Sequence, residues 1–369
     1  MTQPRLTRPL AWRLGIGMAL LLTGAGGWWW WLHQPVRVGV DLLLGDGAAW
    51  DPTARYAAEL YLEDHPQSPI QLVNLFSTLE PASAAPAILQ QKRNGVRFFL
   101  SSHPSTHLLP SLGEFSRGEA LAINTGAVSM RLVGRNDDLL RVAPDLVQEQ
   151  QAMARTLQRL PGRRVLVLLD QGNPAYASAV LTQFSQALKR LGAWQVVARP
   201  ITVRTFNPRR DQALMQGKFD ALYVVAGTFQ PAIGNIAQLF HQQHPQAAIL
   251  LTPWARSPAI VAHSGPAAQR IWLTSPYPAR RQDPSIDAYV RRFHRRYGYN
   301  PNALALGTHQ AIELLDQALA SGARSPAAVK RYLLSKPEHR TSLGPVRFDA
   351  TGDVQARFHV FPAKADQAP

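Results

Sequence analysis

The chain has 369 residues, which at roughly 150 residues per domain predicts two or three domains. Hydrophobic residues make up 46% and charged residues 17%, a composition that excludes a disordered, collagen-like or coiled-coil protein. The formal net charge of +15 raises nucleic acid or an anionic membrane as partners, whereas the lack of cysteine excludes disulfides, thiolate metal sites, thiol catalysis and a lipid-modified cysteine.

The first 35 residues have the pattern of an export signal or a membrane anchor. Arg5, Arg8 and Arg13 precede an uncharged run, residues 14–32, that ends in a cluster of tryptophans. Basic residues before an apolar run place the body of the chain outside the cytoplasm. At 1.5 Å per residue the run is roughly 28 Å long, just enough to cross a bilayer. Residues 25–27, Ala-Gly-Gly, also fit a signal peptidase site, so cleavage is the alternative to the tether that we favour.

After residue 35, apolar runs alternate with amphipathic stretches, which is typical of an α/β fold with parallel sheets. We expect strands at residues 36–44, 70–76, 96–101, 121–124, 164–170, 194–200, 221–226, 248–252 and 271–274. Helices are expected at residues 53–63, 82–94, 144–160, 175–191, 233–243, 285–297 and 302–321. So many strand–helix repeats exceed one open sheet, and they predict two Rossmann-like lobes rather than a single domain.

The chain closes on residues 344–349 and 354–361, which we predict to be two strands joined by a tight turn. This segment, LGPVRFDATGDVQARFHVF from Leu343, resembles the closing hairpin of type I periplasmic solute-binding proteins, the branched-chain amino-acid-binding subgroup of ABC transporters. The resemblance extends to VRVGVDLLLGDGAAW from Val36, RRVLVLLDQGNPAYASAV from Arg163 and DPSIDAYVRRFHRRYGYNPNALALGTHQAIELL from Asp283. The order of these segments along the chain carries the resemblance.

The resemblance implies two lobes, each a parallel sheet between helices, that close on a small molecule. Three hinge crossings are expected near residues 142–144, 274–276 and 342–345, where strand ends lie beside prolines. The amino-terminal lobe would comprise residues 36–143 and 275–343. The carboxyl-terminal lobe would comprise residues 144–274 and 344–369.

Open parallel sheets bind ligands beyond the carboxyl ends of their strands, so the loops that follow the strands are the candidate site. In residues 45–50 the resemblance implies an aromatic ligand contact from Trp50; a turn with a packing tryptophan is the alternative. Residues 101–104 join a strand to a helix, an arrangement that suits an anion. Here the resemblance implies that Ser102, or its neighbour Ser101, holds a ligand carboxylate; a simple helix cap is the alternative.

Residues 124–129 would form the other half of this carboxylate cradle. The family commonly has a threonine where this chain has Val128, so the expected contacts come from the Ala127 amide or from Ser129.

The second lobe departs further from the family pattern. Tyr176 stands where the family places a tyrosine against the ligand, but Thr228 and Phe229 replace a second tyrosine, and Trp254 replaces the glutamate that pairs with a ligand ammonium. A buried ammonium without a partner costs several kcal/mol. We therefore expect an apolar or aromatic carboxylate rather than a free α-amino acid, with Asp170 either substituting for the missing glutamate or capping its loop.

The sequence contains no GxSxG, GxxxxGK[ST] or HExxH motif, so we expect no catalytic residues, no metal and no cofactor. His103 with His107, and His241 with His244, have spacings that could ligate a metal, but we interpret them as solvated histidines. The basic cluster at residues 291–296 superficially resembles a nucleic-acid surface, which the export signal argues against. A solvated surface, or contact with lipid headgroups or a permease, is expected instead.

Together these features predict a non-enzymatic, periplasmic solute-binding protein of an ABC-type transporter. It would capture an amino-acid-like or apolar carboxylate ligand and deliver it to a membrane permease, with no nucleic-acid partner. The departures at Val128, Thr228 and Trp254 leave an alternative open: a sensor or cell-envelope regulator that keeps the fold without transport.

Overall fold

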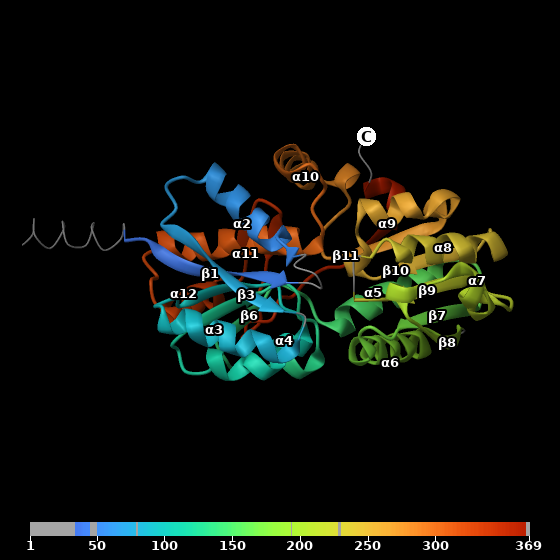
Figure 1. Ribbon diagram of the computed structural model, residues 1–369, viewed down its shortest axis with the longest axis horizontal. Coiled ribbons are helices and arrows are strands. Elements are labelled where there is room, and N and C mark those ends of the chain that lie inside the picture. Colours follow the sequence, from blue (N-terminus) through green and yellow to red (C-terminus); the bar gives the residue numbers. More distant parts are fainter. Residues whose placement is uncertain (1–33, 45–49, 79, 193, 228–229, 367–369) are drawn as a thin grey trace, which may run out of the picture.

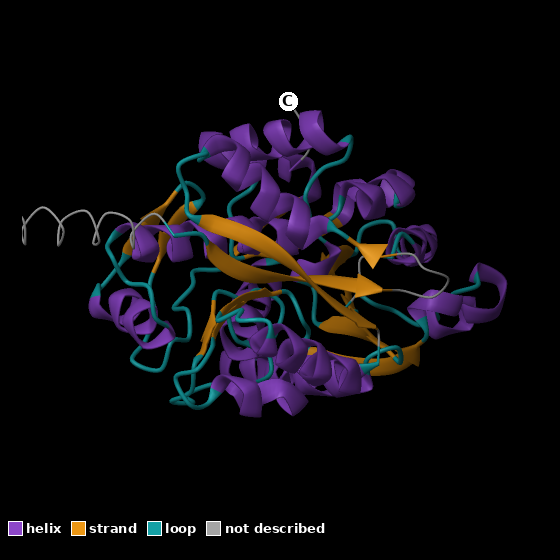
Figure 2. Cartoon of the chain, turned by 60° about the vertical axis from the view of Figure 1, so that its left-hand side comes forward, coloured by secondary structure: helices purple, strands orange, loops and turns teal. Residues whose placement is uncertain are grey.

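The computed structural model describes residues 34–44, 50–78, 80–192, 194–227 and 230–366, and the chain forms two lobes side by side (Figure 1). Each lobe is built around a six-stranded, mostly parallel sheet, and helices flank the sheets (Figure 2). The predicted α/β architecture with two Rossmann-like lobes is confirmed. The predicted anchor, residues 14–32, lies outside the described residues, and no helix within the described ranges is long and apolar enough to cross a membrane.

The parallel strands of the amino-terminal sheet have the order β3-β1-β4-β5-β6, and β2 pairs antiparallel with the end of β1. Their bounds are β1 (Val36–Leu44), β2 (Trp50–Asp51), β3 (Ile70–Thr78), β4 (Phe98–Ser101), β5 (Leu121–Asn124) and β6 (Leu139–Arg141). The helices that pack around it are α2 (Thr53–Asp64), α3 (Ala84–Arg93), α4 (Ser105–Ser111), α10 (Pro284–Tyr297), α11 (Ala303–Ala320) and α12 (Pro326–Ser335). Strands β4, β5 and β6 are buried along their whole length, which agrees with the apolar residues that make up each strand except its last residue.

The second sheet has the order β14-β11-β10-β9-β7-β8, with β14 as an antiparallel edge strand. Its strands are β7 (Arg164–Asp170), β8 (Gln195–Ile201), β9 (Ala221–Val225), β10 (Ala248–Leu251), β11 (Ile271–Ser275) and β14 (His359–Pro362). The helices of this lobe are α5 (Leu146–Arg159), α6 (Pro174–Leu191), α7 (Pro208–Asp211), α8 (Ala232–Gln243) and α9 (Pro258–His263). In both sheets the first strand pairs with the next parallel strand on one side (β3 or β8) and with the following one on the other side (β4 or β9). The strand order therefore reverses at the first strand, and the crevices beyond β1 and β4 and beyond β7 and β9 are the expected ligand sites.

The chain passes between the sheets at three places. It leaves β6 for α5 over residues 142–145 and leaves β11 for α10 over residues 276–283. The third passage lies later than residues 342–345, because Val346 and Val354 still pack in the core of the amino-terminal lobe. The next strand along the chain, β14, is the one that pairs in the second sheet. We therefore propose the third hinge at residues 355–358, with 344–354 belonging to the amino-terminal lobe.

The closing segment also pairs differently from the predicted hairpin. Strand β13 (Gly344–Val346) pairs with β12 (His339–Thr341), and a single bridge between Phe348 and Val354 remains of the predicted pairing. The turn at its tip is held by an ion pair in which Arg141 Nη2 lies 2.6 Å from Asp353 Oδ1, with the arginine 1% exposed. This buried pair, with the backbone hydrogen bonds that Arg141 makes to Gly352 and Val354, fastens residues 349–354 onto β6.

The second passage between the sheets is braced by another buried arginine. The Arg256 guanidinium donates to the carbonyl oxygens of Tyr277 (3.2 Å) and Pro278 (2.9 Å) and to the Ser275 hydroxyl (2.7 Å), and it pairs with Asp366. Because these acceptors lie on the segment that follows β11, Arg256 fixes the direction in which the chain leaves the second lobe.

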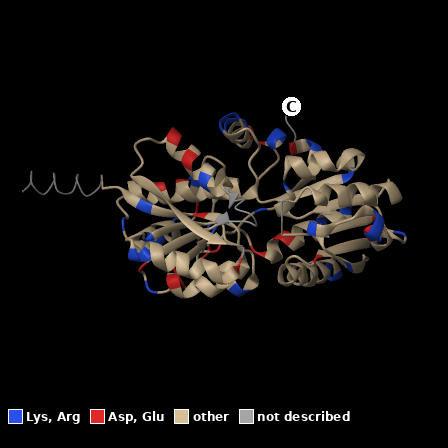
Figure 3. Ribbon diagram, in the orientation of Figure 1, with Lys and Arg blue, Asp and Glu red and all other residues tan. Residues whose placement is uncertain are grey.

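The basic cluster on α10 is partly neutralised (Figure 3). Arg292 pairs with Asp64, and Arg296 Nε lies 2.8 Å from Glu63 Oε1, both acids being at the end of α2. Arg291 pairs with Asp287 one turn earlier in the same helix. The cluster therefore joins two helices of one lobe, which accounts for these arginines without a nucleic-acid partner.

Candidate functional site

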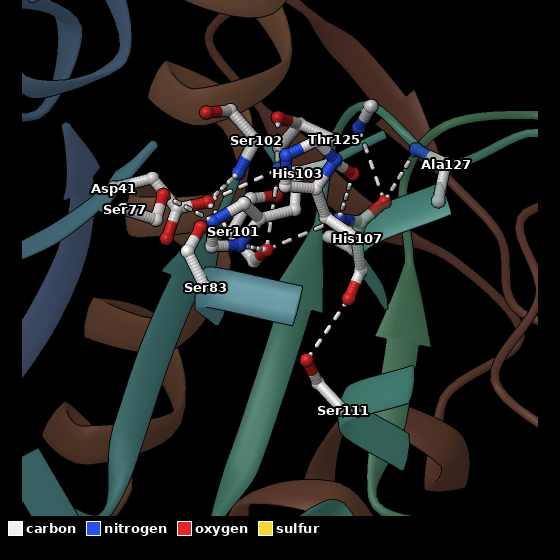
Figure 4. Close-up of polar contacts among 12 residues, drawn as sticks. Asp41, Ser77, Ser83, Ser101, Ser102, His103, His107, Ser111, Thr125 and Ala127 are labelled. Atoms are coloured by element: carbon white, nitrogen blue, oxygen red, sulfur yellow. Dashed lines mark hydrogen bonds and ion pairs between the residues drawn. The ribbon is translucent and has the colours of Figure 1, made fainter. Parts of the chain in front are cut away.

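A buried polar network lies at the carboxyl ends of β1, β3 and β4 (Figure 4). Asp41 Oδ2 lies 3.0 Å from His103 Nδ1, and His103 Nε2 lies 2.8 Å from the Ser77 hydroxyl. The Ser101 hydroxyl is 3.2 Å from His103 Nδ1. These polar groups are buried at the point where the topology predicts a ligand, so the sequence places chemistry at the expected edge of the sheet.

The Asp41 carboxylate occupies the expected anion cradle. It accepts hydrogen bonds from the Ser102 amide (2.6 Å) and the His103 amide (3.0 Å), the donors that the sequence left free for a ligand (Figure 4). Complete burial raises the pKa of Asp41, while the His103 imidazole, the Ser101 hydroxyl and these two amides act in the opposite direction. An acceptor supplied by the chain itself thus satisfies this half of the cradle.

The donors of the other half also have partners within the chain. The Ala127 amide donates to Asn124 Oδ1 (2.6 Å), and the Ser129 amide donates to the Ser105 hydroxyl (3.0 Å). Gly126 makes this turn possible, because a Cβ at that position would lie 2.3 Å from the carbonyl oxygen of Ser102. The expectation of free backbone donors facing one spot is therefore not met in this structure.

Asp41, His103 and Ser77 follow the carboxylate–imidazole–hydroxyl order of hydrolytic triads. All three are at most 2% exposed, and none of them lines the cavity described below. Their contacts orient the Asp41 carboxylate toward the two amides.

The expectation that His103 and His107 are solvated is wrong. His103 is fully buried and His107 is 5% exposed. Helix α4 begins only four residues after β4 ends, so both residues lie close to the end of the sheet, and their imidazole rings stack with centroids 5.7 Å apart. Within the described ranges no group of three or more His, Cys, Asp or Glu could hold a metal ion.

A cavity of about 40 Å³ lies between the lobes. Its walls come from helices and strand-following loops of both lobes and from all three passages between the sheets. It is lined by Thr125, Val128, Val142, Ala143, Pro144, Glu149, Pro253, Trp254, Pro276, Tyr277, Ala303, Gly307 and Phe358. Val128, on the amino-terminal lobe, packs in the same apolar cluster as Leu146, Met153 and Trp254 of the other lobe. The lobes are thus in contact across the cavity.

Glu149 is the acidic residue on the cavity wall, and the sequence reasoning missed it. It lies in the first turn of α5, is 1% exposed and receives a 2.8 Å hydrogen bond from Gln150 Nε2 at Oε1. Burial raises its pKa from 4.5 to about 8. A signal was present: Leu146, Met153 and Leu157 mark the apolar face of this helix, and Glu149 falls on it at helical spacing.

The remaining predicted site residues are placed unevenly. Tyr176 lies in the first turn of α6, and its pKa is raised by burial and by the nearby Glu149 carboxyl. Trp254 lines the cavity, directly after β10. Asp170 accepts from the amides of Gly172 and Val203, both at 3.1 Å, so it caps its own loop.

Three predicted contacts escape structural description. Thr228 and Phe229 lie outside the described residues, and for Trp50 only the backbone pairing with Leu44 is described.

Comparison with known proteins identifies the fold and the family of the chain that carries this site. Residues 35–368 match the family described as periplasmic binding protein. No curated protein matches the chain in sequence.

Solved structures agree in fold over nearly the whole body. The leucine binding protein LivK from Thermotoga maritima has a TM-score of 0.74 and 20% identity, with 88% of this chain and 94% of that chain covered. The LivJ substrate binding protein from Streptococcus pneumoniae, in complex with isoleucine, has a TM-score of 0.72 and 16% identity, with 87% and 94% covered. A solute binding protein of an ABC transporter from Rhodopseudomonas palustris, in complex with 3,4-dihydroxybenzoic acid, has a TM-score of 0.75 and 16% identity, with 88% and 92% covered.

Proposed function

The chain belongs to the periplasmic binding protein family, and from this premise we propose that it is the extracytoplasmic solute-binding protein of an ABC-type transporter. It would capture a small molecule between its lobes without catalysing a reaction. The observation that carries the proposal is the cavity itself, whose walls come from both lobes and from the segments that connect them. A solute held there would contact both lobes at once and so favour their closed arrangement.

The present arrangement is close to a closed one. A cavity of about 40 Å³ is far smaller than the roughly 150 Å³ that accepts benzene in a well-studied engineered protein. A solute of several heavy atoms therefore requires the lobes to separate and to close again around it. The contact of Val128 with the apolar cluster of Trp254 is the part of the interface that must open.

We further propose that the closed lobes deliver the solute to a membrane permease and that residues 14–32 tether the body to the inner membrane. The family is one of periplasmic proteins, which supports an extracytoplasmic location. We also propose the two lobes expected from the sequence, except that residues 344–354 belong to the amino-terminal lobe and the third hinge lies at residues 355–358.

Two ligand classes follow from the sequence and from the neighbours. The solved relatives bind amino acids or aromatic carboxylates, and the sequence favours an apolar or aromatic carboxylate. For either class, a ligand carboxylate held by Ser101, Ser102, Ala127 or Ser129 would have to displace the partners that these residues already have. Tyr176 and Trp254, with Trp50, Thr228 and Phe229, remain the proposed walls of the site.

The filled cradle and the small cavity favour one second candidate, a sensor or envelope regulator that uses lobe closure without transport. Solute uptake separates the two. Deleting the gene would abolish uptake of the bound solute if the protein serves a transporter, and would leave uptake unchanged if it serves as a sensor.

Native mass spectrometry of the full chain, purified without denaturant, tests the proposal that both candidates share. We expect one small molecule bound per chain, released on unfolding. Preparations that carry no small molecule and whose melting temperature responds to none of a broad panel of solutes would contradict it.

A further inference from the structure

The cavity between the lobes presents an acid to its contents. Glu149 is 1% exposed, so it is 99% buried. Its carboxyl accepts a hydrogen bond from Gln150 and has no other partner among the described residues. Among the described residues that line the cavity there is no lysine, arginine or histidine. The wall therefore offers an anionic or hydrogen-bonding group with no cation of the chain to neutralise it.

The groups that face Glu149 from the neighbouring elements are acidic or neutral. Asp145 caps the start of the helix that carries Glu149, Tyr176 comes from α6 and Tyr223 from β9, and each interacts electrostatically with Glu149. Tyr277, after β11, lines the same cavity. A positive charge placed in the cavity would therefore gain an ion pair with Glu149 and would meet no like charge from these elements.

Aromatic side chains complete the wall. Trp254, Tyr277 and Phe358 line the cavity together with Glu149. Aromatic faces attract organic cations, and they also accept an apolar ligand body. The combination of a buried carboxyl with aromatic walls suits an organic ammonium ion.

The occupied cradle after β4, which does not line the cavity, explains why the ligand need not carry a carboxylate. The amides of Ser102 and His103 donate to Asp41, which is itself buried, so a carboxylate of the chain already fills that position. A ligand carboxylate that entered the cradle would meet the Asp41 carboxyl and would find these donors engaged.

We propose that the solute is a small organic amine without a carboxylate, whose ammonium group pairs with Glu149 and whose apolar body packs against Trp254 and Tyr277. This inference rests on the proposed solute-binding function and names a ligand class that differs from the two classes given there. It replaces the expected carboxylate ligand, because the chain's own Asp41 takes the role of the ligand's acid.

Matched pairs of ligands test the proposal by isothermal titration of the full chain in detergent. Benzylamine is compared with benzoate, and isoamylamine with leucine, since each pair shares an apolar body and differs in the charged group. We expect each amine to bind at least about 100-fold more tightly than its partner, because the carboxylate would be buried without a partner. Tighter binding of benzoate or leucine would overturn the inference.

Two variants show whether Glu149 is the recognising group. Glu149→Gln keeps the shape and the hydrogen bond to Gln150 but removes the charge, and we expect it to weaken amine binding at least about 100-fold. Glu80→Gln, an exposed residue of the amino-terminal lobe, should leave the affinity unchanged. Equal affinities of Glu149→Gln and the wild type would overturn the inference.

The pH dependence separates recognition from a structural effect of the substitution. An ammonium pairs with the ionised carboxylate, so binding to the wild type must release the proton that Glu149 holds at low pH. With its pKa at about 8, amine affinity should rise roughly 50-fold from pH 6 to pH 8 and stay flat in Glu149→Gln. A flat profile in the wild type would contradict the assignment.

The two proposals fail in different ways. A co-purified solute without an amine, or binding of carboxylates alone, would overturn this inference and leave the solute-binding function intact. Failure of all four ligands, together with an empty chain in native mass spectrometry, would overturn both.

Discussion

Replacing Asp41 by alanine should empty the anion cradle. In the wild type its carboxyl accepts from the Ser102 and His103 amides and contacts the His103 imidazole, and it is 1% exposed. Asp41→Ala leaves both amides inside the protein without their acceptor. Each of these two hydrogen bonds contributes about 1–2 kcal/mol, so we expect a loss of about 2–4 kcal/mol in the free energy of unfolding.

Thermal unfolding of the full chain measures this loss. For a lobe of this size about 1 kcal/mol corresponds to roughly 2–4 °C, so the melting temperature should fall by about 4–16 °C. Acetate should restore it, because its carboxylate fits the vacated space: at about 100 times its dissociation constant a bound anion returns about 2.7 kcal/mol.

Ser77→Ala is the matched control. It removes the hydroxyl that contacts His103 Nε2 but leaves the Asp41 carboxyl in place, so it should be destabilised and gain nothing from acetate. The account of the cradle would be refuted if Asp41→Ala melted within about 1 °C of the wild type, or if acetate stabilised all three proteins equally.

Three further outcomes follow from the packing. Burial raises the pKa of Glu149 from 4.5 to about 8 in the folded state, so its contribution to stability is greatest at low pH and is lost as the pH rises. In denaturant titrations the free energy of unfolding of the wild type should fall by about 4 kcal/mol between pH 5 and pH 9 relative to that of Glu149→Gln. Parallel pH dependences of the two proteins would contradict the burial of this acid. Gly126→Ala should lower the free energy of unfolding by about 1–3 kcal/mol, because the added Cβ would lie 2.3 Å from a carbonyl oxygen. Gly113→Ala, with open space around it, should change the free energy of unfolding by less than about 1 kcal/mol. Equal effects of the two substitutions would argue against the tight turn. Arg141→Ala should lower the free energy of unfolding by about 3–5 kcal/mol, because it leaves the buried Asp353 without its ion-pair partner. Arg347→Ala breaks an exposed pair with Glu338 and should lower it by less than about 1 kcal/mol. Comparable losses in the two variants would show that the buried pair does not fasten the segment before the proposed third hinge.

The long strands were predictable because their apolar runs are continuous and end at polar loops. Strands β1, β5 and β7 begin and end at the predicted residues. Strand β6 escaped prediction, since three residues are too few for a periodic signal and its burial depends on pairing with β5. The third passage between the sheets, which we propose as a hinge, lies later than the sequence predicted, because the Arg141–Asp353 pair joins residues 212 apart in the sequence.

The candidate site shows the same division between local and distant information. The sequence correctly placed polar groups after β4 and β5, since loop composition is local. It gave no sign that Asp41, 61 residues before Ser102, would accept the amide of that loop, because such a contact depends on which strands are neighbours. Glu149 could have been found from its position on the apolar face of α5.

A crystal structure of the full chain with its co-purified solute tests the central claim most directly. We predict that the ligand's nitrogen lies within hydrogen-bond distance of Glu149 and that Asp41 still accepts the amides of Ser102 and His103. A ligand carboxylate bound to those two amides, with Asp41 displaced, would contradict the account.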